Sequence, residues 1–434
     1  MSASGEINDP TLDPSLQSWV ESANEVGGNF PIQNLPWGVF ITSDGEDRIG
    51  VAIGDMILDV KQAIDTLALQ GLPPETACSL CAPTLNAFMG QGPRSWRAAR
   101  RSISSLLARG ADPHPQLLIP QSSVSMRMPA QIGDYTDFYA SRHHASNVGR
   151  MFRPDADPLL PNYLNLPVGY HGRASSVVVS GTPIRRPMGQ LKPDDGPSQH
   201  GPCRLLDYEM EMGVFIGQGS PMGHPIAIQE ADNHLFGIVI LNDWSARDVQ
   251  KWEYQPLGPF NAKNFGTSIS PWIVTMEALS PFRRSGPERL PDDPPLLDYL
   301  VPTKDDVLDV TVDVYIVSEQ MRSQQMAPHR VSRGNLSDLT WTFSQMLAHH
   351  SSTGCPMQPG DLMGSGTISG TEKESRGCLL EMTWRGQEPV ELPDGTQRKF
   401  LQDGDEVIMS AFCESEGAVR IGLGDCSAVI QPAL

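Results

Sequence analysis

The stretch from Leu206 to Gly217 constrains this chain most strongly, because it is typical of one β-strand with two unlike faces. Side chains alternate between the faces of a strand. The apolar face comprises Tyr208, Met210, Met212, Val214 and Ile216. Glu209 and Glu211 share the other face, roughly 7 Å apart by the rise of a strand. Burying two carboxylates without a counter-charge is costly, so the stretch predicts a positively charged partner beside them.

Composition limits the partners of the chain. Its 434 residues predict two domains. With 51 acidic and 32 basic residues, the net charge is −19. That charge repels nucleic acid and anionic membrane surfaces, so we expect neither as a partner. An anionic small substrate would need a local cationic pocket.

Seven cysteines are a sparse and odd number for this length, which favours a reducing compartment over a disulfide framework. Cys78 and Cys81 form a lone CxxC without a second pair, so a structural role is expected. The segment Met1–Glu6 lacks a basic region, and no run of about 18 apolar residues occurs. We therefore predict a soluble, cytoplasmic protein.

The first part of the chain predicts a small antiparallel β unit. Short apolar runs at 39–41, 49–53 and 56–60 are joined by Asp-Gly and Gly-Asp turns. Residues 1 to about 30 are interpreted as an arm or a loosely held first helix. A helix follows over 95–107, and its cluster of Arg94, Arg97, Arg100 and Arg101 is interpreted as a solvated face. Prolines beyond it indicate a linker, so we predict domains over 1–128 and 129–434.

The rest of the chain is predicted to be rich in β-strands with attached helices. Residues 307–317 alternate between apolar and polar, which indicates a strand. Helical patterns are shorter and cover roughly 137–147, 244–252 and 338–350. The predicted class is therefore a β-rich α+β protein.

Carboxylates at the ends of predicted strands and helices are the candidate ligands of a cation site. Asp243 ends an apolar run before a predicted helix, which is most simply an N-cap. In the helix predicted over 137–147, Asp137 and His144 share a face roughly 10 Å apart, leaving room for a ligand. If the carboxylates of Asp137, Glu209, Glu211 and Asp243 came together, their oxygen atoms would suit calcium or magnesium rather than zinc. The alternative is that the Glu-x-Glu pair is a solvated strand face.

The Gly-rich loop over 358–370 lacks a P-loop lysine, so phosphate binding is not expected. Its backbone N–H groups and the Thr367 hydroxyl could bind a carboxylate or an oxyanion. Ordinary hairpin turns explain the glycines equally well.

Long motifs in this chain resemble the fumarylacetoacetate hydrolase family. The similar segments are Asp134–Arg153, Leu166–Arg186, Cys203–Glu211, Asn242–Thr267 and Gly360–Gly370. The Glu-x-Glu, the later Asp and the Pro-Gly-Asp loop occur across the wider superfamily. Tyr-His-Gly-Arg-Ala-Ser-Ser and Asn-Asp-Trp-Ser-Ala-Arg-Asp are more specific to this family.

The resemblance implies a role for each matching residue. A divalent cation, typically Ca²⁺, would be held by Asp137, Glu209, Glu211 and Asp243. A second site, for Mg²⁺, would involve Asp243, Thr267 and the backbone carbonyl of Lys263, whose ammonium cannot ligate a cation. His144 matches the general base, Glu381 in an expected strand 379–382 orients it, and the Lys263 side chain is free to meet an oxyanion. The substrate-binding positions would be Tyr139, Arg153, Tyr170, Arg247, Gln250, Tyr254 and Thr367. His143 and Arg150 depart from the family pattern, so either His143 or His144 could accept the proton.

The family's architecture implies a small N-terminal SH3-like β-barrel and a mixed β-sandwich roll, assembled as a homodimer. The expected activity is hydrolysis of the diketo acid fumarylacetoacetate to fumarate and acetoacetate, the closing step of tyrosine and phenylalanine breakdown. Alternatives are an acylpyruvate hydrolase, an oxaloacetate decarboxylase, or a calcium-binding scaffold without catalysis.

Overall fold

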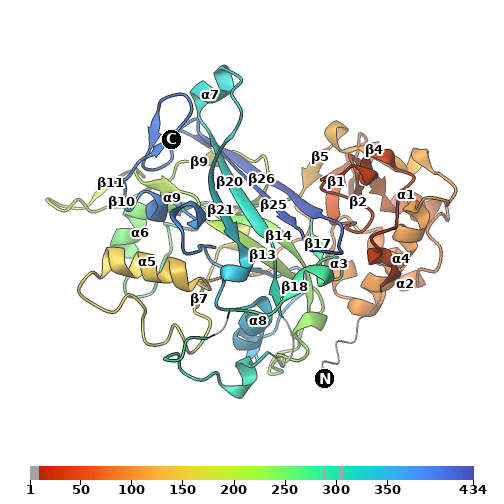
Figure 1. The fold of residues 1–434 in the computed structure, drawn as a ribbon, viewed down its shortest axis with the longest axis horizontal. Helices are drawn as coiled ribbons and strands as arrows, with labels where there is room; N and C mark the ends of the chain where they lie inside the picture. The colour runs from red at the N-terminus through yellow and green to blue at the C-terminus, as the bar shows by residue number, and fades with distance from the viewer. Residues whose placement is uncertain (1–8, 288, 303–305) are drawn as a thin grey trace.

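The predicted strand with two unlike faces lies in the largest sheet of the computed structural model, which describes residues 9–287, 289–302 and 306–434 (Figure 1). In order, this central sheet contains β7 (Gly169–His171), β6 (Tyr135–Phe138), β22 (Leu362–Gly364), β13 (Met210–Ile216), β14 (Leu235–Asp243), β16 (Thr267–Ile269) and β8 (Val177–Val179). A short strand, β17 (Val274–Thr275), also pairs with β14. The β22–β6 and β16–β8 pairs are parallel and the other pairs antiparallel, so the sheet is mixed.

The predicted strand is interrupted, which corrects the continuous strand expected over Leu206–Gly217. β12 (Leu206–Asp207) pairs with β15 (Ser245–Ala246), and β13 begins only at Met210. Between them, side chains replace the strand ladder: Asp207 accepts a hydrogen bond from the Tyr208 N–H at 3.0 Å. The Asn242 side-chain oxygen accepts one from the Glu209 N–H at 3.1 Å. Such local side-chain bonds compete with regular pairing.

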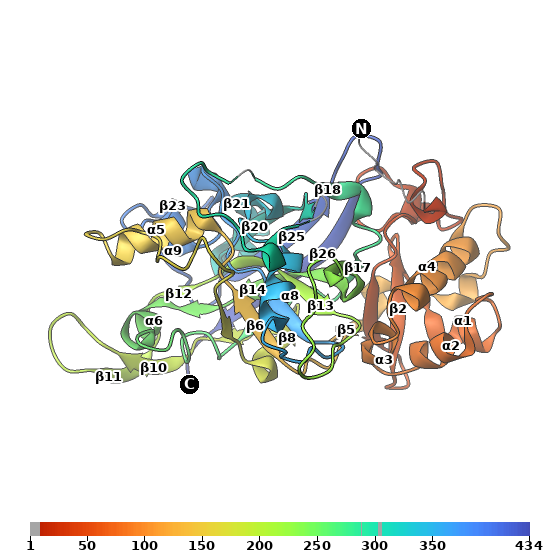
Figure 2. The ribbon, with the colours of Figure 1, turned by 90° about the horizontal axis from the view of Figure 1, so that it is seen from below.

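The two faces of the central sheet bury two different cores. Met210, Met212 and Val214 belong to a core that also contains residues of a second sheet. That sheet runs in the order β21 (His329–Asn335), β20 (Thr311–Val317), β25 (Glu406–Cys413), β26 (Ile421–Gln431) and β9 (Ile184–Arg185). The strands β20, β25 and β26 of this sheet lie beside β13 and β14 (Figure 2). On the opposite face, Phe215 and Phe236 pack with the N-terminal residues. The sheet is therefore buried on both sides, and the β-rich α+β class is confirmed.

The N-terminal elements lie at one end of the molecule in both views (Figures 1 and 2). Their antiparallel sheet has the order β4 (Leu118–Pro120), β3 (Met56–Asp59), β2 (Asp47–Ile53), β1 (Trp37–Ile41) and β5 (Ser125–Arg127). The helices are α1 (Val60–Asp65), α2 (Pro74–Leu80), α3 (Asn86–Met89) and α4 (Pro93–Leu107). The predicted strands at 39–41 and 49–53 are confirmed, and the third ends at Asp59, because Asp59 caps α1 and Val60 begins that helix.

The segment predicted to be an arm or a loosely held first helix is packed over its described residues, 9–30. Ser18 donates a hydrogen bond to the Leu107 carbonyl at 2.7 Å, and Trp19 donates one to the Leu106 carbonyl at 2.8 Å. Phe30 is buried. These contacts join the arm to the last turn of α4, a tertiary interaction that a polar, Gly-rich composition does not reveal. Residues 1–8 of the predicted arm lie outside the described residues.

The arginine cluster of α4 is not uniformly solvated, which corrects the predicted solvated face. Arg100 is buried and donates hydrogen bonds to Thr11 at 2.8 Å, to the Asn34 carbonyl at 2.7 Å and to the Gln33 carbonyl. Burial lowers the pKa of Arg100 to about 10. Its guanidinium therefore holds the arm against the helix.

Replacing Arg100 should weaken the fold measurably. Hydrogen bonds to a buried charged group are worth more than neutral ones, and Arg100→Met leaves two carbonyls unsatisfied. We expect a loss of about 2 to 4 kcal/mol in the free energy of unfolding. Arg101→Met, on the exposed side of the same helix, should change it by less than about 0.5 kcal/mol. Denaturant titration of both variants measures the difference, and equal losses would contradict the role of Arg100.

Several predicted elements have other bounds or another type. Asp137 lies in β6 rather than in a helix, and α5 (Arg142–Phe152) begins after the Ser141 cap. The strand predicted over 307–317 is split into β19 (Val307–Leu308), paired with β18 (Arg283–Arg284), and β20. The helix predicted over 338–350 is α8 (Phe343–Ser351), because the Thr342 and Gln345 capping box fixes its start. A further short helix, α7 (Glu319–Ser323), follows β20.

Two misassigned elements carry site residues. Asp243 ends β14 and is not the N-cap of α6 (Arg247–Glu253), whose N-cap position is Ala246. Glu381 lies in the short helix α9 (Leu379–Met382), not in a strand. Short apolar segments do not distinguish helix from strand by period alone. No helix among the described residues is long and apolar enough to cross a membrane.

Candidate active site

A cavity of about 600 Å³ opens where the central sheet meets α5, α6 and the segments that follow them. These helices lie at the end of the molecule opposite α1, α2 and α4 (Figures 1 and 2). Predicted site residues that line the cavity are Asp137, Tyr139, His144, Arg153, Tyr170, Glu209, Glu211, Arg247, Gln250, Tyr254, Lys263 and Thr367. The three other predicted residues, Asp243, Thr267 and Glu381, each contact a residue of this set or one another.

Three strands bring three carboxylates together. Asp137 on β6, Glu211 on β13 and Asp243 on β14 offer oxygen atoms that all lie within 4.8 Å of one another. The strand between β6 and β13 contributes Gly364, where a Cβ would lie 2.5 Å from Asp137 Oδ1. A glycine at this position therefore leaves room for the carboxylates to meet above the sheet.

The charge balance of this cluster favours a cation. Burial and the neighbouring Asp243 raise the pKa of Asp137 well above its usual range. Burial and Asp137 do the same to the pKa of Glu211. Asp137 Oδ1 and Glu211 Oε1 are buried and have no hydrogen-bond partner. Because buried polar atoms are normally satisfied, and because hard cations prefer carboxylate oxygens, this cluster fits a divalent cation.

Glu209 is not among the three carboxylates whose oxygens lie within 4.8 Å of one another, and its expected role as a fourth ligand stays a prediction. It forms ion pairs with the Lys263 ammonium and, at 2.7 Å, with Arg247. Burial raises the pKa of Glu209, but Lys263 and Arg247 outweigh it and lower that pKa to about 2. The sequence predicts a positive partner beside the two glutamates. Lys263 and Arg247 fill this role, and both pair with Glu209.

Lys263 also connects the two groups of carboxylates. Its Nζ lies 2.8 Å from Asp243 Oδ2, which also accepts a hydrogen bond from the Tyr170 hydroxyl at 2.7 Å. Thr267 donates to the other oxygen of Asp243 at 3.2 Å. The residues implied for a second cation site are therefore adjacent.

A histidine–carboxylate pair faces the same cavity. His144 Nδ1, on α5, lies 2.5 Å from Glu381 Oε2, on α9. Burial opposes ionisation of Glu381, but His144 outweighs it and lowers the pKa of Glu381 to about 2. The ionised carboxylate can only accept, so Nδ1–H donates and Nε2 is the basic atom. His143 does not line the cavity, so the geometry favours His144 as the base.

This pair predicts an acid-labile contribution to stability. The pKa of Glu381 is lower in the folded protein than its usual value of 4.5, so the stabilisation is complete above that pH and is lost as the pH falls toward 2. We expect the free-energy difference between the protein and Glu381→Gln to shrink by about 2 kcal/mol from pH 6 to pH 3. Denaturant titrations at the two pH values measure it. A difference that is constant with pH would contradict the pairing.

The predicted substrate-binding residues lie around this pair. The Tyr139 ring packs edge-on against His144, with ring centroids 5.2 Å apart. Arg247 donates to the Gln250 side chain at 3.2 Å, and the Tyr254 ring packs against Phe152. Arg153 donates to the Pro158 carbonyl, while its buried Nε has no partner.

The Thr367 loop lies over Glu211. Gly366 N–H donates to Glu211 Oε2 at 3.1 Å. Gly366 has a φ of 75°, and a Cβ there would lie 2.2 Å from the Phe138 carbonyl oxygen. This backbone conformation and the close approach both require glycine, so the Gly-rich loop is a specific part of the site.

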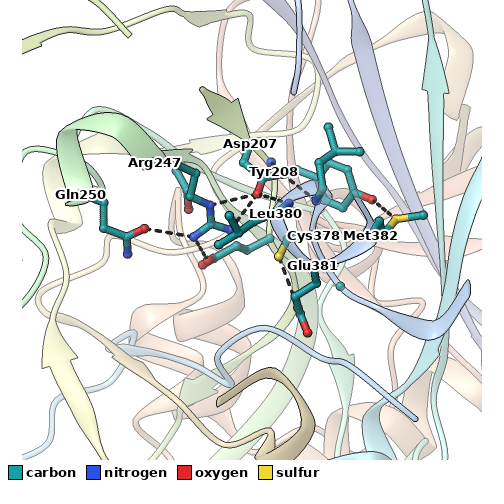
Figure 3. A network of polar contacts seen from close by, with 12 residues as sticks. Asp207, Tyr208, Arg247, Gln250, Cys378, Leu380, Glu381 and Met382 are labelled. Carbon is teal, nitrogen blue, oxygen red and sulfur yellow. Dashed lines mark hydrogen bonds and ion pairs between the residues drawn. The ribbon is translucent and has the colours of Figure 1, made fainter. Parts of the chain in front are cut away.

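The sequence reasoning missed three residues that support the site. Asn147 and Ser369 donate to Glu381 at 2.9 and 2.8 Å. Asp207 binds Arg247 and the start of α9 (Figure 3). Asp207 continues the alternation of Glu209 and Glu211, which was an available signal. Asn147 and Ser369 carry none, because they meet Glu381 only through the fold.

A histidine–carboxylate pair beside a cluster of buried carboxylates, on a β-rich α+β fold, defines a class of enzyme site suited to metal-assisted hydrolysis. Two family models match this chain: fumarylacetoacetase N-terminal over residues 33–129, and fumarylacetoacetate (FAA) hydrolase C-terminal over residues 134–431. The chain belongs to the fumarylacetoacetase family.

Similar proteins extend over nearly the whole chain. The fumarylacetoacetases of Bos taurus and Homo sapiens are each 51% identical over 415 residues, covering 94% of this chain and 97% of theirs. That of Arabidopsis thaliana is 43% identical and covers 96% of this chain and 99% of its own. The solved fumarylacetoacetate hydrolase of Exiguobacterium antarcticum shares the fold, with a TM-score of 0.51 and 18% identity over 92% of this chain and 99% of its own.

Proposed function

We propose that this protein hydrolyses fumarylacetoacetate to fumarate and acetoacetate, as the names of its relatives indicate for them. The observation that carries the proposal is the His144–Glu381 pair, which faces the same cavity as the buried carboxylates. A store for cations would need the carboxylates but not a paired base. The proposed setting is the cytoplasm, in the breakdown of tyrosine and phenylalanine.

Each residue of the pair has a defined task. Nε2 of His144 takes a proton from water, whose oxygen attacks the carbonyl carbon next to the alkene. Glu381 fixes the tautomer and stabilises the imidazolium. The bond between that carbon and the adjacent methylene then breaks, and its electron pair leaves with acetoacetate. The imidazolium returns the proton to the leaving methylene carbon.

Positively charged side chains of the cavity face the charge that develops on the substrate. The Lys263 ammonium meets the tetrahedral oxyanion, together with the Thr367 loop. Arg153, Arg247 and Tyr254 hold the terminal carboxylates and exclude other orientations, with Tyr139, Tyr170 and Gln250 completing the wall. This supplies the cationic pocket that an anionic substrate requires in a chain of net charge −19.

A divalent cation completes the site in this proposal. Asp137, Glu209, Glu211 and Asp243 would hold Ca²⁺, with the Lys263 and Arg247 side chains beside Glu209. Mg²⁺ would use Asp243, Thr267 and the Lys263 carbonyl. When bound, a cation supplies Lewis-acid stabilisation of negative charge on the diketone oxygens.

We also propose that the chain divides into units 1–128 and 129–434. In this proposal the five-stranded N-terminal sheet forms an SH3-like barrel, the two larger sheets form a mixed β-sandwich roll, and two copies form a homodimer. Light scattering of the purified protein measures the mass of the assembly.

The activity is tested by the absorbance of the diketone. Purified protein should consume fumarylacetoacetate, and a chelator should abolish the loss until divalent cation is restored. Failure with fumarylacetoacetate but turnover of an acylpyruvate or oxaloacetate would replace the substrate within the same superfamily. Failure with all three, with calcium still bound, would favour a cation-binding scaffold.

A further inference from the structure

Asp207 is a buried carboxylate that the mechanism above does not use. It is fully buried at the end of β12. Its Oδ1 accepts hydrogen bonds from the N–H groups of Leu379, at 2.8 Å, and Tyr208, at 3.0 Å. Its Oδ2 accepts from the Leu380 N–H at 3.0 Å and from Arg247 Nε at 2.9 Å. One side chain thus joins two segments of the cavity wall, as Figure 3 shows.

The first of these segments is α9, which carries Glu381. A helix of four residues has too few internal hydrogen bonds to be stable alone. Its N-cap residue, Cys378, makes no side-chain capping bond. The first N–H groups of a helix need acceptors from elsewhere, and Asp207 supplies them from 172 residues away along the chain.

The second segment is the start of α6, which carries Arg247. This guanidinium lies between Asp207 and Glu209, with ion pairs of 2.9 and 2.7 Å. It neutralises the buried charge of Asp207 and donates to Gln250 (Figure 3). Cys378 Sγ and Ser369 Oγ add contacts to Glu381 at 3.3 and 2.8 Å, so α9 is held at its start and at its functional side chain.

We propose that Asp207 is a positioning residue for the reaction, which fixes α9 so that Glu381 meets His144. This inference rests on the proposed hydrolytic function. Both oxygens are needed because each accepts from a different N–H of α9. An asparagine would offer one oxygen, and its amide N–H₂ would face either the donors of Leu380 and Arg247 or, if flipped, those of Leu379 and Tyr208, placing donor against donor.

Asp207→Asn is the direct test, with Asp405→Asn as the matched control. Asp405 is also buried and accepts from Arg398 at 2.7 and 2.8 Å and from the Gln402 N–H at 2.8 Å. Each variant removes one buried carboxylate charge that pairs with an arginine. We expect Asp207→Asn to lower kcat at least about tenfold, with KM within about threefold, because a misplaced base loses rate more than affinity. Asp405→Asn should change kcat less than about twofold.

Asp207→Glu covers the case in which Asp207→Asn does not fold. It keeps the charge opposite Arg247 but moves the carboxylate by one methylene relative to α9. We expect the same loss of kcat at nearly constant KM. Normal kcat in this folded variant would overturn the proposal.

A double variant shows whether Asp207 acts through Glu381. If it does, Asp207→Asn combined with Glu381→Gln should lose little more kcat than Glu381→Gln alone. Asp405→Asn combined with Glu381→Gln gives the independent reference. Losses that multiply for Asp207 would overturn the proposal while leaving the function intact. If the unchanged protein does not hydrolyse fumarylacetoacetate, the proposed function itself fails.

Discussion

His144→Asn should lower kcat for fumarylacetoacetate by about 10²- to 10⁴-fold. Asparagine can still donate toward Glu381 from a position near that of Nδ1, so the buried carboxylate keeps a partner. It has no atom that accepts a proton at neutral pH. The expected result is therefore a folded protein that has lost its base, measured by the decay of the diketone absorbance.

His143 is the control for this experiment. It is the neighbouring residue on α5, is half-buried and does not line the cavity. His143 lies near Asp338. Burial raises the pKa of the Asp338 carboxyl, and the charge of His143 acts against this rise. His143→Asn should keep kcat within about twofold of the unchanged protein. The reverse pattern, with activity lost only in His143→Asn, would assign the base to His143.

Glu211→Gln should remove the stabilisation of the protein by divalent cations. Without cations, the variant should be more stable than the unchanged protein. Glutamine keeps the size of the side chain and an oxygen that can accept from Gly366 N–H. It removes one of three carboxylates whose oxygens lie within 4.8 Å of one another. In chelator the variant should melt at a higher temperature than the unchanged protein, because like charges repel there.

Added calcium should stabilise the unchanged protein far more than the variant. A ligand at a hundredfold excess over its Kd contributes about 2.7 kcal/mol to the folded state. Glu211→Gln should show a small fraction of that gain and should lose at least about 10²-fold in kcat, since a cation site without its charge loses affinity and Lewis-acid assistance. Differential scanning calorimetry with calcium and with chelator measures the effect. Identical melting curves for both proteins in both conditions would refute the cation site.

Much of the fold could be predicted because it follows from local patterns. Alternation around Met210 and Met212 placed this strand inside a sheet, and turn residues placed the first three N-terminal strands. Element types failed where the segment was short. Asp137 and Glu381 lie in elements of four residues, where local preference is weaker than tertiary contacts.

The site was predicted as a set of residues, not as an arrangement. Residue types and spacing named the acids and His144, and the resemblance to a family added Glu381 and the role of each. Neither could show that Glu209 forms ion pairs with Lys263 and Arg247. Its partners lie 38 and 54 residues away in the chain.

Local patterns and composition were enough to predict a strand with one acidic face, the need for a cationic pocket in an acidic chain, and a resemblance to a family. Tertiary contacts were needed to establish which carboxylates lie within 4.8 Å of one another, that His144 pairs with Glu381, and that Asp207 accepts hydrogen bonds from the start of α9. His144 and Glu381 are 237 residues apart in the chain. Contacts of this kind form because burying a charge demands a partner, and the fold decides which partner is within reach.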